Sequence, residues 1–296
     1  MAITPKARLP IQQRAEQIAS ALPPLLVEAE HVATTVAQGV HGRRRVGQGE
    51  TFWQFRRYES GDSPQSIDWR QSAKSDRVFV REMEWEAAQS VWIWRDTSAS
   101  MAWSSSPELP EKRRRADILA LALAVLLIRG GEFVTFLGSG IRPSNGKTTL
   151  ERMAKIIDRG EQDSAGLPTV LPLPRFAQVV MISDFLSPIE EIEEVARGYA
   201  SRGVKGHLLQ ILDPAEELLP YDGRTRFEGL EGEQSWLLSR VESVRAPYQQ
   251  RFKAQREGLQ SIAQRLSWGY SAHRSDHSPN TALLALYLAM TQDRGR

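Results

Sequence analysis

Asp96, Ser98 and Ser100 form a D-x-S-x-S sequence directly after an apolar, strand-length run. A loop of this kind at the end of a strand can direct one carboxylate and two hydroxyl groups toward the same point. Three hard oxygen donors, with water in the remaining positions, suit octahedral Mg²⁺ or Mn²⁺. The spacing therefore indicates a divalent-cation site, although Asp and Ser in this pattern also cap ordinary turns.

A second apolar run ends in a similar way, at Ser183 and Asp184. If the two runs are parallel strands of one sheet, Asp184 projects from the same sheet edge as Asp96. Two aspartates at one edge favour the cation-site interpretation over simple turn capping.

The segments that must position these residues alternate between strand-like and helix-like patterns from residue 89 onward. Strand-like runs cover 89–96, 132–138, 177–184, 204–212 and 268–274, and helical patterns cover 111–129, 150–158, 188–201, 235–266 and 279–290. Strands that are apolar on both faces indicate a parallel sheet covered by helices on both sides. We expect an α/β fold with a Rossmann-like, doubly wound, mostly parallel sheet, whose ligand site lies at the carboxyl ends of the strands.

The first third of the chain has a different pattern. Residues 11–38 favour helix, interrupted at Pro23 and Pro24, whereas no helical periodicity appears between 39 and 84. Basic and acidic residues are mixed there, which favours ion pairs within a small module over a nucleic-acid surface. We therefore predict two parts: a smaller helical and β-rich module at 1–87 and an α/β domain at 88–296.

Composition excludes several classes of function. The net charge is only +2, which gives no reason to expect nucleic acid or an anionic membrane as a partner. The chain has no cysteine, so disulfides, thiolate metal sites and cysteine nucleophiles are excluded. The longest apolar run, 118–128, is too short to span a bilayer, and the first residues lack the apolar core of a secretory signal. We expect a soluble, cytoplasmic protein without a membrane span.

Three other chemical patterns are weaker. The loop at 139–149 resembles a P-loop, but Gly140 and Gly146 enclose five residues instead of four, which displaces the amide groups that hold phosphate. An aspartate-based phosphatase needs a second Asp two residues after the nucleophile, where this chain has Ser98. His273 and His277 have helical spacing but no glutamate after the first histidine, so a structural or surface role is favoured.

Several of these motifs together resemble known families. Residues 89–101 with VVMISDF resemble a von Willebrand factor A domain with its metal-ion-dependent adhesion site. Residues 43–101 resemble the DUF58 family, through GRRRVGQGETFWQFRRYESGD, SIDWRQSAKSDRVFVREMEWE and DTSASM. The likeness continues more loosely through DPAEELLP and SPNTALLALY toward the end of the chain.

The resemblance implies a domain that binds a partner instead of turning over a substrate. It implies that a divalent ion, Mg²⁺ or alternatively Mn²⁺ or Ca²⁺, is held by Asp96, Ser98, Ser100 and Asp184 and completed by a carboxylate of the partner. The family pattern also has a threonine ligand, for which Thr148 or its neighbour Thr149 is the candidate. Relatives are commonly encoded beside MoxR-type AAA+ ATPases, which implies an adaptor in a chaperone-like assembly. The alternative is a Mg²⁺-dependent phosphohydrolase or nucleotide-binding enzyme that uses Asp96 and Asp184.

Overall fold

The computed structural model describes residues 24–40, 52–57, 67, 69–74, 78–83, 90–160, 166–230 and 235–292. Contacts between residues divide the chain into two units. The larger unit comprises Met1–Val40 together with Gln89–Arg296, and the smaller unit comprises His41–Ala88. Each unit is described separately below.

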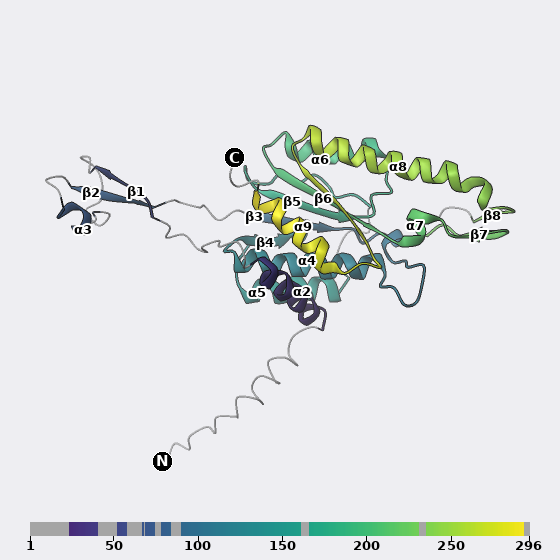
Figure 1. Cartoon of the computed structure of the whole chain (residues 1–296), viewed down its shortest axis with the longest axis horizontal. Coiled ribbons are helices and arrows are strands. Elements are labelled where there is room, and N and C mark those ends of the chain that lie inside the picture. Colours follow the sequence, from purple (N-terminus) through teal and green to yellow (C-terminus); the bar gives the residue numbers. More distant parts are fainter. Residues whose placement is uncertain are drawn as a thin grey trace, which may run out of the picture. The chain divides into compact units, whose positions relative to one another are not determined.

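Five parallel strands form the central sheet of the larger unit (Figure 1). They are β3 (Ser90–Arg95), β4 (Phe133–Phe136), β5 (Gln178–Ser183), β6 (Lys205–Leu212) and β9 (Gly269–Arg274). Their spatial order is β4-β3-β5-β6-β9, so the chain first moves from β3 to one side and then crosses back to the other. This arrangement confirms the predicted α/β fold with a doubly wound, parallel sheet.

Helices cover both faces of this sheet. The longer helices of the unit are α2 (Pro24–Val40), α4 (Lys112–Arg129), α5 (Lys147–Asp158), α6 (Ile189–Ala200), α8 (Glu242–Arg265) and α9 (Pro279–Gln292). Side chains of α2, α4, α5 and α9 pack into one apolar cluster with the sheet, and those of α6 and α8 pack into a second. Along β5, Val180 and Ile182 belong to the first cluster, whereas Val179 and Met181 belong to the second. The alternation explains why this strand is apolar at every position.

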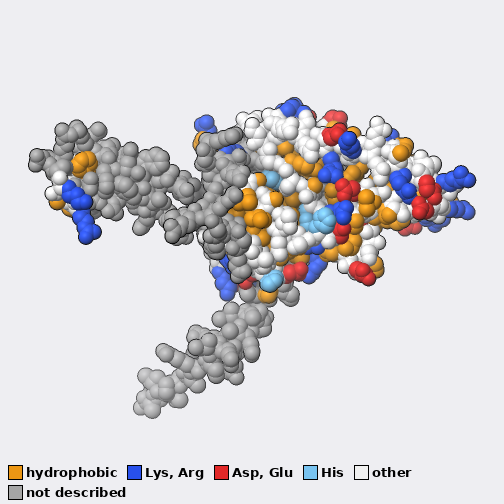
Figure 2. Space-filling view, in the orientation of Figure 1, with side chains coloured by type: hydrophobic (Ala, Val, Ile, Leu, Met, Phe, Trp, Pro, Cys, Tyr) orange, Lys and Arg blue, Asp and Glu red, His pale blue; other side chains and the backbone are white. Residues whose placement is uncertain are grey.

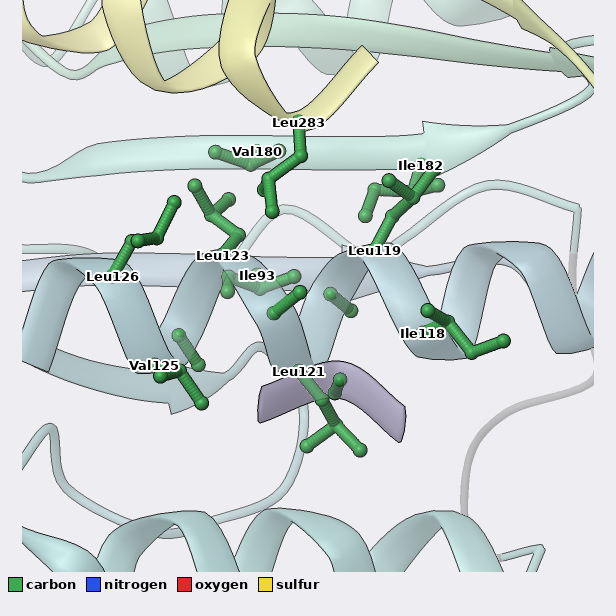
Figure 3. Close-up of a cluster of buried hydrophobic side chains, with 14 of the residues drawn as sticks. Ile93, Ile118, Leu119, Leu121, Leu123, Val125, Leu126, Val180, Ile182 and Leu283 are labelled. Atoms are coloured by element: carbon green, nitrogen blue, oxygen red, sulfur yellow. The ribbon is translucent and has the colours of Figure 1, made fainter. Parts of the chain in front are cut away.

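Helix α4 lies at the centre of the first cluster. Its run of Leu, Ala, Val and Ile is buried around the whole helix, because the sheet packs on one side and α2 and α5 pack on the other. Figure 3 shows Leu119 and Leu123 directed toward Val180 and Ile182, while Leu121 and Val125 point away from the sheet. The helix predicted at 111–129 is therefore confirmed, and its apolar run at 118–128 lies in the core.

The predicted boundary after residue 87 assigned the helical segment near the N-terminus to the wrong unit. Helix α2 packs on α4 and α9 of the larger unit, and Leu26, Ala29 and Ala33 are fully buried there. The physical reason is that α4 is apolar on the side away from the sheet and needs a cover. Sequence position alone does not reveal which distant segment supplies that cover.

The smaller unit contains an antiparallel pair of strands, β1 (Phe52–Arg57) and β2 (Phe79–Met83), and the short helix α3 (Trp69–Ser72). Strand β1 has an irregularity in its pairing between Phe52 and Gln54. Both strands lie in the part of the chain that the sequence predicts to be β-rich. The motif residues 43–49 and 61–62 lie outside the described residues.

One segment of the larger unit differs from its predicted structure. The first residues of the helix predicted at 235–266 instead form β8 (Trp236–Leu238). This strand pairs with β7 (Thr225–Phe227) in a hairpin that follows α7 (Pro214–Leu218). Helix α8 therefore begins at Glu242, several residues after the predicted start. The polar residues around Trp236 fit a short exposed strand as well as they fit a helix end.

The face of the described chain that is visible in Figure 2 has mixed charge. Figure 2 shows acidic and basic side chains interspersed over the visible face, without a wide area of one sign. Among the described residues, no helix has both the length and the apolar character needed to cross a bilayer.

The contact between α2 and α4 can be tested by removing apolar volume. We expect Leu26→Ala to lower the free energy of unfolding by about 3 kcal/mol, because Leu26 is fully buried and its loss leaves a cavity. Denaturant unfolding of the full chain, followed by circular dichroism, measures this change. Val27→Ala is the matched control, since Val27 is 45% exposed. Equal effects of the two substitutions would contradict the assignment of α2 to the larger core.

His207 on β6 should make folding sensitive to acid. Burial lowers the pKa of His207 to about 4, below its ordinary value of 6.5, and its Nε2 lies 2.8 Å from the Ser271 hydroxyl. Because the unfolded chain binds this proton more readily, stability is complete above pH 6.5 and falls as the pH drops toward 4. The loss attributable to His207 between pH 7.5 and pH 5 should be about 2 kcal/mol.

Urea unfolding at a series of pH values measures this effect. His207→Gln should flatten the pH dependence by that amount, and His273, whose pKa burial also lowers to about 4, should account for a further part of the slope. The control is His277→Gln, because His277 is exposed. An unchanged slope in His207→Gln would show that His207 does not remain neutral in the folded state.

Candidate metal and ligand site

The carboxyl ends of β3 and β5 meet where the strand order reverses. Strand β3 leads to β4 on one side, and its other neighbour β5 leads to β6 on the opposite side of the sheet. Open α/β sheets bind ligands at this position, because the diverging loops leave a crevice. The amide of Asp96 donates to the carbonyl of Ile182 over 2.8 Å, so the two strand ends are joined directly before the loops diverge.

The Asp96 carboxylate is buried and held in a fixed orientation. Its Oδ1 accepts a hydrogen bond from the Ser98 amide at 2.8 Å, and its Oδ2 accepts one from the Ser183 hydroxyl at 2.6 Å. Burial raises the pKa of Asp96, and the hydrogen bonds from Ser183 and Ser98 oppose that shift. Among the described residues, no Lys, Arg or His side chain forms an ion pair with Asp96. Within the described part of the chain, the carboxylate is therefore stabilised by neutral donors.

Ser98 and Ser100 place two hydroxyl groups beside this carboxylate. Their Oγ atoms lie 3.0 Å apart, and both residues line the same pocket as Asp96. The loop is turned by the short helix η2 (Ala99–Met101). It is also anchored by Arg113, whose guanidinium donates to the carbonyls of Thr97 and Ser98 at 3.1 and 3.3 Å. The sequence prediction that these three side chains converge is in keeping with this geometry.

The spacing of the two hydroxyls suits a shared cation. Two oxygen ligands in neighbouring positions of an octahedral Mg²⁺ lie about 3.0 Å apart, because each Mg–O distance is about 2.1 Å. Among the described residues, no group of three or more His, Cys, Asp or Glu side chains could hold a metal. A site here must therefore depend on serine hydroxyls and water together with the carboxylates, and the D-x-S-x-S loop supplies that donor set.

Asp184 lies at the end of β5 and lines the same pocket. Its Oδ1 accepts from the Leu186 amide at 3.3 Å, and its backbone carbonyl accepts from the Gln210 side chain at 3.0 Å. Its Oδ2 accepts a hydrogen bond from the Lys112 ammonium at 2.8 Å, within a fully buried ion pair. One oxygen of Asp184 is thus committed to a lysine, a contact that the sequence did not predict.

Lys112 forms a second ion pair, with Glu216 on α7. Burial disfavours the charged ammonium, but Asp184 and Glu216 outweigh that effect and hold the pKa of Lys112 above its ordinary value. Glu216 is oriented by a capping box, in which its Oε2 accepts from the Asp213 amide at 2.9 Å. Glu216 also lines the pocket, although the sequence analysis did not select it. The D-x-x-E spacing of Asp213 and Glu216 is the signal that could have indicated its orientation.

The pocket above these residues has a volume of about 770 Å³. Its floor is polar and is formed by Asp96, Ser98, Ser100, Asp184 and Glu216. Much of its wall is apolar and comes from the loop after β5 and from the region of the β7–β8 hairpin. The apolar wall residues are Trp103, Leu186, Pro188, Tyr221, Phe227 and Leu230. Leu186 and Leu230 are about half exposed, at 55% and 48%. The arrangement can receive a polar group at its base with apolar atoms around it.

The predicted threonine ligand does not reach this pocket. Thr148 is exposed on the first turn of α5 and is not among the residues that line the pocket. Thr149 is buried, and its hydroxyl lies 2.8 Å from the Ser144 hydroxyl. The loop before α5 folds back on β4, where Ser144 and Val134 exchange backbone hydrogen bonds. This pairing holds both threonines with β4, on the far side of β3 from Asp184.

Residues 54–258 match the protein family described as "Protein of unknown function DUF58". The chain belongs to the DUF58 family. It is 26% identical over 219 residues to the uncharacterized proteins Rv1480 of Mycobacterium tuberculosis H37Rv and Mb1516 of Mycobacterium bovis, covering 69% of this chain and 68% of each relative. The first-loop residues and Asp184 all fall inside the matched range.

Two solved structures are also similar to this DUF58 chain. One is described as an aerotolerance-related membrane protein from Bacteroides fragilis, with a TM-score of 0.44, 16% identity and coverage of 69% of this chain and all of that one. The other is the conserved hypothetical protein BatB from Bacteroides thetaiotaomicron, with a TM-score of 0.39, 16% identity and coverage of 71% and 100%.

The buried ion pairs of Lys112 should be costly to break. We expect Lys112→Met to lower the free energy of unfolding by roughly 3–5 kcal/mol, because it leaves Asp184 and Glu216 buried without a counter-charge. Thermal and denaturant unfolding of the metal-free protein measure this loss. Lys155→Met on the exposed surface of α5 is the control and should change stability by less than about 0.5 kcal/mol. A small effect at Lys112 would show that these ion pairs do not persist in solution.

Proposed function

We propose that this DUF58 protein is a divalent-cation-dependent protein-interaction module, with a site like the metal-ion-dependent adhesion site of a von Willebrand factor A domain. The observation that supports this most directly is the first loop. Asp96, Ser98 and Ser100 converge at the strand-order reversal, and the two serine oxygens stand 3.0 Å apart beside a carboxylate without a cationic partner among the described residues.

In this proposal Asp96, Ser98 and Ser100 hold the ion, Mg²⁺ or alternatively Mn²⁺ or Ca²⁺. When bound, the ion supplies positive charge that attracts a carboxylate. Asp184 contributes negative charge from the neighbouring strand, while its Oδ2 remains with Lys112. Thr148 and Thr149 are left out of the proposed ligand set, because neither lines the pocket.

The pocket walls suggest the chemistry of the partner. An Asp or Glu side chain that reaches the floor would be surrounded by Leu186, Phe227 and Leu230. The partner segment should therefore carry an acidic residue with apolar neighbours, since apolar contact around a charged pair excludes water and strengthens it. The family resemblance makes a MoxR-type AAA+ ATPase the class of partner that we propose.

The phosphohydrolase alternative is less well supported by the same geometry. An aspartate nucleophile works with a second acidic group that protonates the leaving group. The place of that acid–base Asp, two residues after Asp96, is taken by Ser98. The Asp184 carboxylate is engaged by Lys112.

Metal titration tests the proposal. We expect the wild-type protein to bind one Mg²⁺ in isothermal titration calorimetry, and Mn²⁺ in the same site by electron paramagnetic resonance. Asp96→Ala should lose this binding by at least about a hundredfold, because it removes the only charged group that we assign to the first loop. Asp158→Ala on the exposed surface of α5 is the matched control and should bind like the wild type.

Two results would overturn the proposal. Equal metal affinity in Asp96→Ala and the wild type would place any ion elsewhere, provided that both unfold at similar temperatures. Mg²⁺-dependent hydrolysis of p-nitrophenyl phosphate or ATP that is abolished by Asp184→Ala would establish the enzymatic alternative instead.

A further inference from the structure

Lys112 is an unusual neighbour for a cation site. Its side chain is fully buried, and its ammonium lies between two carboxylates that both line the pocket, Asp184 and Glu216. The ammonium also lies 6.0 Å from the centre of the Trp103 ring, another wall of the pocket. A buried lysine ammonium therefore lies beside the site where a divalent cation is proposed to bind.

The charges at the pocket floor determine what this lysine does. Asp96, Asp184 and Glu216 are three carboxylates, and Lys112 neutralises one of them. Arg226 and Glu228, which also line the pocket, are opposite in sign and add no net charge. The charged side chains that line the pocket, taken together with Lys112, thus have a net charge equal and opposite to that of one divalent cation, so that the loaded floor is neutral.

Without Lys112 the floor would carry one more negative charge. It would attract a divalent cation more strongly, because charges on buried side chains such as Asp96 and Asp184 are only weakly screened. The loaded floor would still be negative, however, and would repel the carboxylate of a partner. When the loaded floor is neutral, the cation attracts an acidic group of the partner, and no excess negative charge on the floor repels that group.

We propose that Lys112 is the residue that sets the cation affinity of this site, by holding Asp184 and Glu216 and keeping the floor charge matched to a single divalent ion. This inference rests on the proposed function, since it concerns the same cation. Lys112 acts through the two carboxylates and is a positioning residue, not a ligand. Its effect should therefore depend on net charge and be reversible by a compensating change at Glu216.

The test is a charge-compensation series measured with Mg²⁺ alone by calorimetry on the full chain. Lys112→Met should tighten Mg²⁺ binding by about tenfold or more, and Glu216→Gln should weaken it by a similar factor. The double variant K112M/E216Q restores the original net charge and should bind within about threefold of the wild type. Lys112→Arg keeps the charge, and Lys155→Met changes a distant charge, so both should resemble the wild type.

The outcomes separate the two proposals. If the wild type binds Mg²⁺ and Asp96→Ala does not, but Lys112→Met binds no more tightly than the wild type, the role of Lys112 is wrong and the cation site stands. If the wild type binds no Mg²⁺, the proposed function is wrong, and the proposed role of Lys112 is wrong as well because it concerns the same cation.

The series remains decisive if Lys112→Met is too unstable to measure. K112M/E216Q leaves only one buried carboxylate without its partner, and its affinity can be compared directly with that of Glu216→Gln. Recovery of affinity in the double variant relative to Glu216→Gln supports the inference. Equal affinities in the double variant and Glu216→Gln would overturn it.

Discussion

The stabilisation of one buried charge, the Asp96 carboxylate, constrains the whole carboxyl edge of the sheet. A carboxylate in this position must receive hydrogen bonds or a cation, since an uncompensated buried charge is too costly to keep. The Ser183 hydroxyl, on the neighbouring strand, donates a hydrogen bond to Oδ2 of Asp96, and the Ser98 amide, within the loop, donates one to Oδ1. The Ser183 hydroxyl is available only because β3 and β5 lie side by side in parallel. Strand pairing and site geometry are therefore two consequences of the same arrangement.

The same constraint explains which features of the candidate site can be predicted from the sequence. Apolar runs that end at Asp96 and Asp184 indicate parallel strands with polar ends, and the right-handed connections between them bring those ends together. The positions of Ser98 and Ser100 follow from local spacing after Asp96. These relations are short in sequence or fixed by general rules of α/β topology, and so a single chain is enough to predict them.

The contacts that sequence analysis missed join distant segments. Lys112 is 72 residues from Asp184 and 104 from Glu216, and its position at the start of a helix suggests an ordinary exposed charge. The burial of Lys112 arises only when α4 and α7 come together at the pocket. Thr148 shows the opposite error: it follows a strand in the expected order, but the pairing of Ser144 with Val134 holds its loop on β4. Neither result could be obtained from spacing, because each depends on which segments pack in three dimensions.

Helix α4 connects the core to the site. Its middle is apolar around the whole circumference, so hydrophobic burial alone does not fix how the helix is rotated or how far it slides along the sheet. Two buried ion pairs near the start of α4 fix both its rotation and its position. Lys112 pairs with Asp184 at the end of β5, and Asp117 pairs with Arg95 at the end of β3, with a nitrogen–oxygen distance of 2.8 Å in each pair. Burial raises the pKa of Asp117 to about 6 even though Arg95 lies beside it. Buried ion pairs add little net stability, and their best-attested contribution is to select one packing arrangement among several. We infer that the pairs on α4 have this role, so that Lys112 both helps to fix the register of the central helix and contributes to the charge at the floor of the pocket.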